Sequence, residues 1–377
     1  MRRRATRGAI ASLAMLCLCP LVTSCGGPES SPAPADAALE PCSGQCGSAG
    51  FVIATEQASN TLAKIDVATD TVVARLQVGD GPSAMAVDHQ SRILYVTSNR
   101  DDAVVAVDPD RMLVAPLSIP GLGRAPIGIC LMADRRTLLV TTRGEDGVPS
   151  SDDRVDLLTL DNSSWPPTAT LAGSVPTGLH PIGCVGDHAG RYAVVTVRNE
   201  PAIDVIDLAT RAIVARATGL RADAEPEGLD LHPTADVVYV TLHGPASRIE
   251  VLDLATLTFQ PGVPIKSSPA ARPSTGVFTP DGSRFYLSGQ TVAQVFMFDS
   301  REPLQPVQDM SVALRVGPQP HFIAFLPDGR AYVANTNNGQ PRGNLSVIHD
   351  FASTPRVDSP ILSELAGPLG LEYISAP

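Results

Sequence analysis

The chain has 377 residues, with 39 acidic against 28 basic side chains, a formal net charge of −11 and only 4% aromatic residues. The negative charge argues against binding to nucleic acid and against direct adhesion to anionic lipid. The shortage of aromatic side chains also argues against base stacking.

Residues 1–24 are predicted to be a secretory signal peptide. Arg2, Arg3 and Arg4 precede an apolar run over about residues 9–22, which is too short to span a membrane. The run ends in LVTSC, which resembles a bacterial lipobox, so Cys25 is the expected site of lipidation. Ordinary signal-peptidase cleavage, which would leave Cys25 as a plain thiol, is the alternative. Residues 25–50 are rich in Gly, Ser and Pro and are predicted to form a flexible tether.

The lipobox resemblance implies a place in the cell envelope. Gly26 after the cysteine favours the outer membrane of a Gram-negative bacterium, with the lipid anchor as the only membrane contact. Removal of the leader takes away four arginines and leaves a net charge of −15. No later segment has 18 uninterrupted apolar residues, so we expect residues 51–377 to form a soluble, exported and monomeric body.

Seven prolines recur through this body at steps of 44, 55, 45, 47, 47 and 48 residues. Twelve or thirteen residues after each of the first six lies the middle of a β-rich segment such as ILYVT or VVYVT. A strand-rich unit that repeats with this period predicts propeller blades rather than a helical solenoid. The prolines are Pro82, Pro126, Pro181, Pro226, Pro273, Pro320 and Pro368.

A second repeating feature is an aspartate that ends a short apolar run once per period. Asp66 precedes the first proline, and Pro368 follows the last aspartate, Asp350, so residues 51–78 lack an inner strand and residues 365–377 supply one. We therefore predict an all-β, seven-bladed β-propeller with four-stranded blades. Its ring closes when the C-terminal inner strand pairs with the N-terminal strands, which leaves no open edge.

The segment IDVATDTVVARLQVGDGPSAMAVD, followed by ILYVTS, resembles the YVTN-type β-propeller repeat. The match is close over residues 61–98, moderate over 202–243 and looser in the rest of residues 51–377. The resemblance implies a scaffold and no particular activity. The NHL-type repeat shares part of the pattern and implies the same architecture. WD-type repeats need recurring Trp-Asp pairs, but the chain has one tryptophan.

Four cysteines remain beyond the leader and Cys25. Cys42 and Cys46 are expected to form a small local disulfide in an oxidising compartment. Cys130 and Cys184 follow their prolines by four and three residues, so the facing sides of two neighbouring blades present them to each other. They form either a disulfide or two buried thiols.

The best candidate site lies at one mouth of the central channel, where the loops that end at the prolines meet the loops between the second and third strands. The residues beside the prolines are polar on the third to sixth blades and mostly small or apolar on the other three. Ordinary solvated loop ends around a water-filled channel are the alternative. The ligand-binding candidates are His180, Glu225, Glu227, Arg272, Gln319, His321 and His243, and the second set of loops adds Arg100, Arg143, Arg198 and Asn335.

Two functions remain open. The first is a non-enzymatic binding or scaffold module, with an unidentified protein or small molecule at the mouth. The second is a lactonase-like hydrolase of a small anionic substrate, in which His180 acts as base, Glu225 orients it and Arg272 holds a carboxylate. The histidines and glutamates come from different blades without local ligand spacing, so no metal site is predicted. The sequence names no cofactor and no nucleophile motif.

Overall fold

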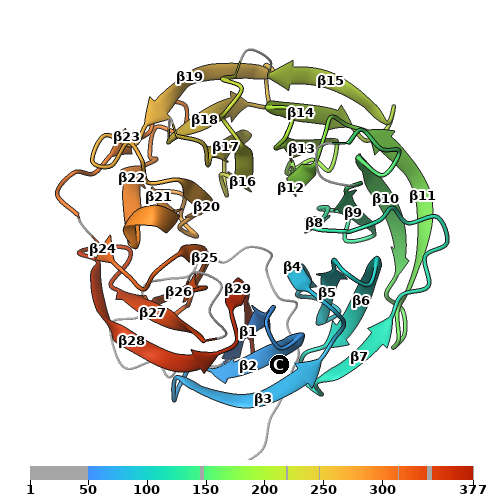
Figure 1. Cartoon of the computed structure of the whole chain (residues 1–377), viewed down its shortest axis with the longest axis horizontal. Helices are drawn as coiled ribbons and strands as arrows, with labels where there is room; N and C mark the ends of the chain where they lie inside the picture. Colours follow the sequence, from blue (N-terminus) through green and yellow to red (C-terminus); the bar gives the residue numbers. More distant parts are fainter. Residues whose placement is uncertain are drawn as a thin grey trace, which may run out of the picture. The chain divides into compact units, whose positions relative to one another are not determined.

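A computed structural model describes residues 50–376, except 145–147, 218–219, 246, 313 and 338–341. The described residues form seven antiparallel sheets around a central axis, so the predicted seven-bladed β-propeller is confirmed (Figure 1). In each blade the first strand is innermost. Among the described residues, no helix is long and apolar enough to cross a membrane.

The blades follow one another along the chain, except that the seventh combines both ends. Blade 1 comprises β4 (Pro82–Asp88), β5 (Ile93–Ser98), β6 (Ala103–Asp108) and β7 (Leu113–Pro116); blade 2 comprises β8 (Ile129–Leu131), β9 (Thr137–Thr142), β10 (Arg154–Asp161) and β11 (Thr168–Pro176); blade 3 comprises β12 (Pro181–Gly186), β13 (Tyr192–Val197), β14 (Ala202–Asp207) and β15 (Ala212–Ala217); blade 4 comprises β16 (Pro226–Leu231), β17 (Val237–Leu242), β18 (Arg248–Asp253) and β19 (Thr258–Pro264).

The remaining blades are less regular at their outer edges. Blade 5 comprises β20 (Pro273–Phe278), β21 (Arg284–Gly289), the 3₁₀ turn η1 (Gln290–Val292), β22 (Gln294–Asp299) and the two short strands β23 (Val307–Gln308) and β24 (Leu314–Arg315), both paired with β22; blade 6 comprises β25 (Pro320–Phe325), β26 (Ala331–Asn335), β27 (Gly343–His349) and β28 (Arg356–Leu365); blade 7 comprises β29 (Pro368–Ser375), β1 (Gly50–Glu56), β2 (Thr61–Asp66) and β3 (Thr71–Gln77).

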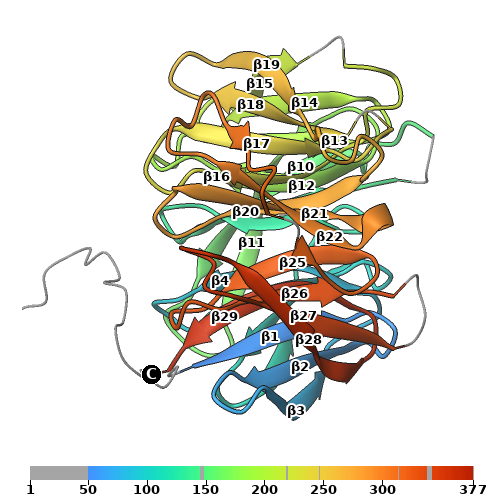
Figure 2. The ribbon, with the colours of Figure 1, turned by 90° about the vertical axis from the view of Figure 1, so that its left-hand side faces the viewer.

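The ring closes as the repeat count predicts. β29 pairs antiparallel with β1, with Tyr373 opposite Val52 and Leu371 opposite Ala54 (Figures 1 and 2). The inner strand of blade 7 therefore comes from the end of the chain, and its other three strands come from the beginning of the described part. This closure pairs the inner edge of β1 with β29 and so completes the seventh blade.

The core consists of apolar layers between neighbouring blades. One layer joins Tyr239 of blade 4 to Phe285 of blade 5, whose ring centroids lie 5.0 Å apart in an edge-to-face arrangement. Because both faces of a blade are covered, the second strands are buried almost throughout, and their residues do not alternate between apolar and polar.

In blades 1 to 4 a threonine of the second strand connects the blade to the next one, and in blade 4 the tyrosine of the YVT segment does so too. The Tyr239 hydroxyl donates to the carbonyl of Pro303, in the outer turn of blade 5, at 2.7 Å. The Thr241 hydroxyl accepts from the amide of Gly228 at 2.9 Å and donates to the carbonyl of Ser274 at 2.6 Å. Thr97, Thr141 and Thr196 make the same pair of contacts. These hydroxyls hold the inner strands at a fixed spacing around the mouth.

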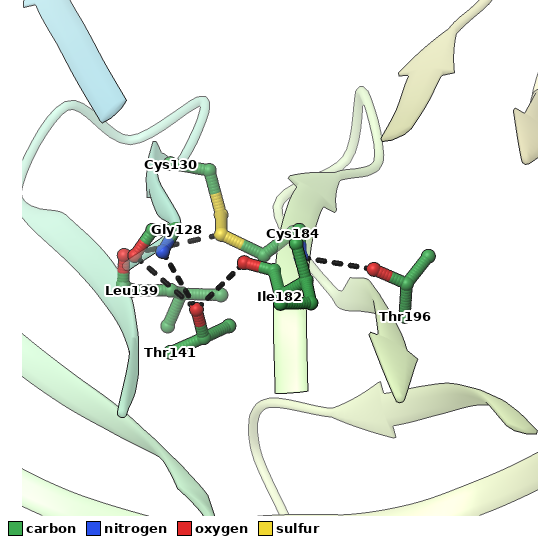
Figure 3. Close-up of a disulfide and its surroundings, with 8 residues drawn as sticks. Gly128, Cys130, Leu139, Thr141, Ile182, Cys184 and Thr196 are labelled. Atoms are coloured by element: carbon green, nitrogen blue, oxygen red, sulfur yellow. Dashed lines mark hydrogen bonds between the residues drawn. A yellow bond between two sulfur atoms is a disulfide. The ribbon is translucent and has the colours of Figure 1, made fainter. Parts of the chain in front are cut away.

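A disulfide adds a covalent link between blades 2 and 3. It joins Cys130 on β8 to Cys184 on β12, with the two Cα atoms 5.9 Å apart. Figure 3 shows it beside Thr141, whose hydroxyl joins Gly128 to Ile182 across the same gap. The disulfide therefore reinforces blade 2, whose inner strand β8, with three residues, is the shortest of the seven inner strands.

Candidate functional site

The residue before each repeated proline has the same unusual backbone conformation. All seven have φ between +44° and +67°, a left-handed region that glycine adopts freely and other residues adopt at a cost of roughly 1–2 kcal/mol each. Only two of them are glycine. The seven residues are Gly81, Ala125, His180, Glu225, Arg272, Gln319 and Gly367. This strain on blades 2 to 6 is tolerated rather than relieved, which is typical of functional positions.

The loop after the second strand brings another residue beside this position. In blade 4 the amide of His243 donates to the carbonyl of Glu225 at 3.0 Å, and in blade 5 the amide of Gln290 donates to that of Arg272 at 3.3 Å. The backbone therefore places two side chains per blade at one mouth of the channel, as the sequence predicts. The side chains themselves contact both neighbouring blades: His243 reaches forward to Gln290 of blade 5, whereas Arg272 reaches back to Glu225 of blade 4.

Glu225 is the centre of the polar cluster. Its Oε2 accepts hydrogen bonds from Arg198 Nη2 and Arg272 Nη2, both at 3.0 Å, and lies 3.0 Å from His243 Nδ1. The glutamate is about one-third exposed, whereas the His243 side chain is 8% exposed. Arg198 also points its Nη1 at Glu227 Oε2, 3.4 Å away, so one guanidinium bridges two carboxylates.

Glu227 leads into a second, less exposed group. Its Oε1 accepts from the hydroxyl of Ser274 at 2.9 Å, and the same hydroxyl oxygen lies 3.1 Å from His321 Nδ1. The Gln290 amide nitrogen lies 3.2 Å from the His321 ring nitrogens, and its Oε1 lies 3.0 Å from His243 Nε2. The buried Glu227 Oε2 has no hydrogen-bond partner among the described residues.

The remaining candidates lie beside this cluster. His180 is 8% exposed, with Arg143 at its Nε2 and Asn199 Nδ2 3.2 Å from its Nδ1. The histidine beside Glu225 is therefore His243, whereas the hydrolase hypothesis places His180 there. Gln319 accepts from the hydroxyl of Thr336 in its own blade at 3.1 Å.

Two side chains suggested for the mouth have other roles. Arg100 is 61% exposed and pairs with Asp80 at 2.9 Å on blade 1. Asn335 is fully buried at the end of β26, where its amide donates to Asn344 and Ser346. Arg100 comes from blade 1, away from the Glu225 cluster, and Asn335 comes from blade 6, which also supplies His321. Each is one residue away from the position that His243 occupies in blade 4.

Two residues of the cluster received no functional role from the sequence. Gln290 directly follows the strand that ends at Gly289, and because it carries no charge the sequence did not indicate it as a site residue. Ser274 directly follows a repeated proline, as Ser83 does on blade 1, and both serines are buried. Only the residues around Ser274 distinguish it from Ser83. A signal for both is their position in the repeat, since Gln290 aligns with His243 and Ser274 aligns with Glu227.

Burial and pairing shift the pKa values in opposite directions. Burial opposes ionisation of Glu225, but hydrogen bonds from His243 and Arg198, with the charges of Arg198 and Arg272, outweigh it and lower the pKa of Glu225. Burial lowers the pKa of His321 to about 4, against the attraction of Glu227, so His321 is neutral near pH 7.

Two carboxyl groups lie further along the inner strands, each four residues after its proline. Burial raises the pKa of Asp230 to about 7, although the amides of Phe278 and Leu231 donate to it. Burial, together with the charge of Asp230, raises the pKa of Glu372 to about 8. Blades 4 and 7, which carry them, lie on opposite sides of the central axis (Figure 1).

Some predicted features cannot be placed. Cys25, Cys42 and Cys46, the leader and most of the tether lie outside the described residues. Within the described part, no group of three or more His, Cys, Asp or Glu side chains is arranged to hold a metal ion.

Comparisons with known proteins identify the fold. No family model matches the chain, and no curated protein matches it. Among solved structures, it is similar to a periplasmic gluconolactonase of Pseudomonas aeruginosa (18% identity, 88% of this chain, 100% of the other, TM-score 0.68). It is also similar to a Bacteroides uniformis protein provisionally assigned as a 6-phosphogluconolactonase (15%, 86% and 99%, 0.67) and to Kuenenia stuttgartiensis hydrazine synthase (17%, 80% and 92%, 0.65). At these identities the likeness shows a propeller fold shared with proteins of different activities.

Proposed function

We propose that this protein is an exported, lipid-anchored β-propeller that binds a small hydroxyl-bearing anion at the mouth of its channel, over blades 3 to 6. The observation that supports the proposal is the arrangement around Arg198. This side chain bridges Glu225 and Glu227, and although its Nη1 lies 3.4 Å from Glu227 Oε2, that buried oxygen makes no hydrogen bond among the described residues. A buried carboxylate oxygen held only by such an ion pair is left short of a hydrogen bond, which a ligand hydroxyl would supply.

The charges at the mouth favour an anion that also carries hydroxyl groups. The Arg272 and Arg198 side chains are 36% and 30% exposed, so each keeps a face open to a ligand carboxylate or phosphate. Glu227 offers an acceptor for a hydroxyl close to these cations. Sugar acids and sugar lactones combine these groups, and the names of two structural neighbours point to the same class of compound.

Binding is testable by isothermal titration calorimetry of the purified protein with D-gluconate, 6-phosphogluconate and uncharged glucose. We expect at least one acid to bind, and we expect Arg272→Ala to weaken its affinity at least tenfold. Arg100→Ala is the matched control on the opposite side of the mouth and should leave the affinity unchanged. Equal affinity in the Arg272→Ala variant, or equal binding of glucose, would count against the proposal.

Lactone hydrolysis is the second candidate, favoured by the neutral imidazole of His321, which Ser274 links to the Glu227 carboxylate. In this reaction a water oxygen bonds to the lactone carbonyl carbon as His321 accepts its proton. Arg272 balances the negative charge that develops on the carbonyl oxygen. The ring C–O bond then breaks, and its oxygen takes up a proton to give the open hydroxy acid.

The hydrolase candidate predicts acid release from D-glucono-δ-lactone above the spontaneous rate, measured at constant pH by base consumption. His321→Gln and Arg272→Ala should each return the rate to background. A wild-type rate equal to background, together with calorimetric binding of the acid, would leave the binding module as the function.

A further inference from the structure

A continuous line of hydrogen bonds crosses the mouth from blade 5 to blade 4. It joins Arg272, His243, Gln290, His321, Ser274 and Glu227, with successive separations of 3.1, 3.0, 3.2, 3.1 and 2.9 Å. Four of its members, Gln290, His321, Ser274 and Glu227, take no part in the Glu225 ion pairs. The direction of donation along this line can be derived from its Glu227 end.

The first step fixes the proton of Ser274. The Glu227 carboxylate, which faces Arg198, only accepts hydrogen bonds, so the single hydroxyl proton of Ser274 points at Glu227 Oε1. The Ser274 oxygen must then accept from His321 Nδ1, which lies 3.1 Å away. His321 therefore carries its proton on Nδ1.

The second step fixes the amide of Gln290. The Gln290 amide nitrogen lies 3.2 Å from both ring nitrogens of His321; because Nδ1 carries the proton, only the lone pair on Nε2 can accept from the Gln290 NH₂ group. With its NH₂ group directed at His321, Gln290 directs its oxygen at His243 Nε2. His243 must therefore carry a proton on Nε2.

The third step shows that this pattern survives a change in the charge of His243. A neutral His243 accepts from Arg272 Nη2 through Nδ1, and a protonated one donates from Nδ1 to Glu225 Oε2. Glu227 Oε2 lies 3.7 Å from the same nitrogen. In both charge states the proton on Nε2, and everything beyond it towards Glu227, stays in place.

We infer that Gln290 and Ser274 are positioning residues, which fix His243 as the Nε2–H form and His321 as the Nδ1–H form. The consequence for a ligand rests on the function proposed above. The mouth presents the Nε2 lone pair of His321 as a proton acceptor for a ligand hydroxyl, or for a water molecule, that displaces the Gln290 amide. Two uncharged residues, Gln290 and Ser274, thereby determine which ring nitrogen of His321 can accept a hydrogen bond from a ligand.

The inference is tested by nitrogen-15 NMR of histidine side chains, in which two-bond couplings distinguish the two tautomers. The chain has seven histidines, and His243→Gln and His321→Gln variants assign the two relevant signals. We expect His321 as Nδ1–H and a proton on His243 Nε2. Ser274→Ala and Gln290→Leu should each change the His321 pattern towards Nε2–H.

Matched controls come from the same positions on the other side of the mouth. Ser83→Ala corresponds to Ser274→Ala, and Gln57→Leu corresponds to Gln290→Leu; neither should alter the two histidine patterns. Nε2–H at His321 in the wild type would overturn the inference, even if every variant failed to fold. The wild-type tautomers expected here, together with no binding of sugar acids, would instead reject the proposed function and leave the hydrogen-bond line standing.

Discussion

The two sides of the channel mouth share one backbone and differ in side chains. Blades 4 and 5 place Glu225 and Arg272 in the strained conformation before the proline, whereas blades 1 and 7 place Gly81 and Gly367 there at little cost. The threonine contacts between blades occur on both sides, at Thr97 and at Thr241. The fold therefore requires the contacts, but it does not require the charged and polar side chains that occupy the strained position on blades 3 to 6; on blade 2 the same position holds Ala125. This difference is the physical reason to look for function over blades 3 to 6.

The largest effect should come from opening the ring at blade 7, on the side of the mouth (blades 7, 1 and 2) where the residues beside the prolines are mostly small or apolar. Deletion of residues 368–377 removes β29, unpairs β1 and uncovers apolar faces of blades 6 and 1. We expect loss of cooperative folding of the whole ring, including the polar side, because the blades cover one another in sequence. Calorimetric melting within a few degrees of the full chain would show that the two sides are independent.

Removal of the central carboxylate should affect the polar side alone. Glu225→Ala leaves Arg198, Arg272 and His243 without their common partner, which we expect to cost about 2 kcal/mol of unfolding free energy. Asp80→Ala breaks an exposed pair with Arg100 and should cost less than about 0.5 kcal/mol. Urea unfolding measures both, and equal costs would contradict the special role of Glu225.

The buried carboxyl groups of Asp230 and Glu372 predict a loss of stability as the pH rises from the range of unfolded carboxyl groups to about 8. The pKa values of Asp230 and Glu372 are raised in the folded protein, so their contribution is complete below the values of unfolded carboxyl groups and is lost as pH rises through about 7 and about 8. Glu372→Gln should flatten this decline in the unfolding free energy, whereas Glu364→Gln, on β28, should not. An unchanged decline in Glu372→Gln would refute the assignment.

The smallest effects concern the strained backbone itself. Ala125→Gly should stabilise the protein by about 0.5–1 kcal/mol, because glycine relieves a φ of +44° and only a methyl group is lost. Gly367→Ala should cost about 1 kcal/mol, although its added carbon would meet Ala58 Cβ at an ordinary 3.6 Å. If thermal unfolding showed that Ala125→Gly destabilises the protein and Gly367→Ala stabilises it, backbone strain at these positions would be refuted.

The architecture was predictable because the sequence repeats with a regular spacing. Seven prolines and seven aspartates fix the number of blades, and the mismatch between the first aspartate and the last proline predicts the pairing of β29 with β1. The positions of Glu225, Glu227, Arg272 and His321 at one mouth follow from the same period.

The partners within the site were not predictable in this way. Whether a side chain of one blade contacts a given residue of a neighbouring blade depends on its rotamer. The sequence therefore could not show whether His180 or His243 is the partner of Glu225, which the structure shows to be His243. Gln290 and Ser274 carry no charge and match no motif. Their role follows only from the hydrogen bonds that they make to His321.

The most direct measurement is a crystal structure of the protein soaked with D-gluconate. The account predicts electron density for the ligand beside Arg272, Glu227 and His321, with a hydroxyl on Glu227 Oε2 and the carboxylate on an arginine. Density confined to the side of blades 7, 1 and 2, or to the outer surface of the ring, would contradict the claim that the polar side is the ligand site.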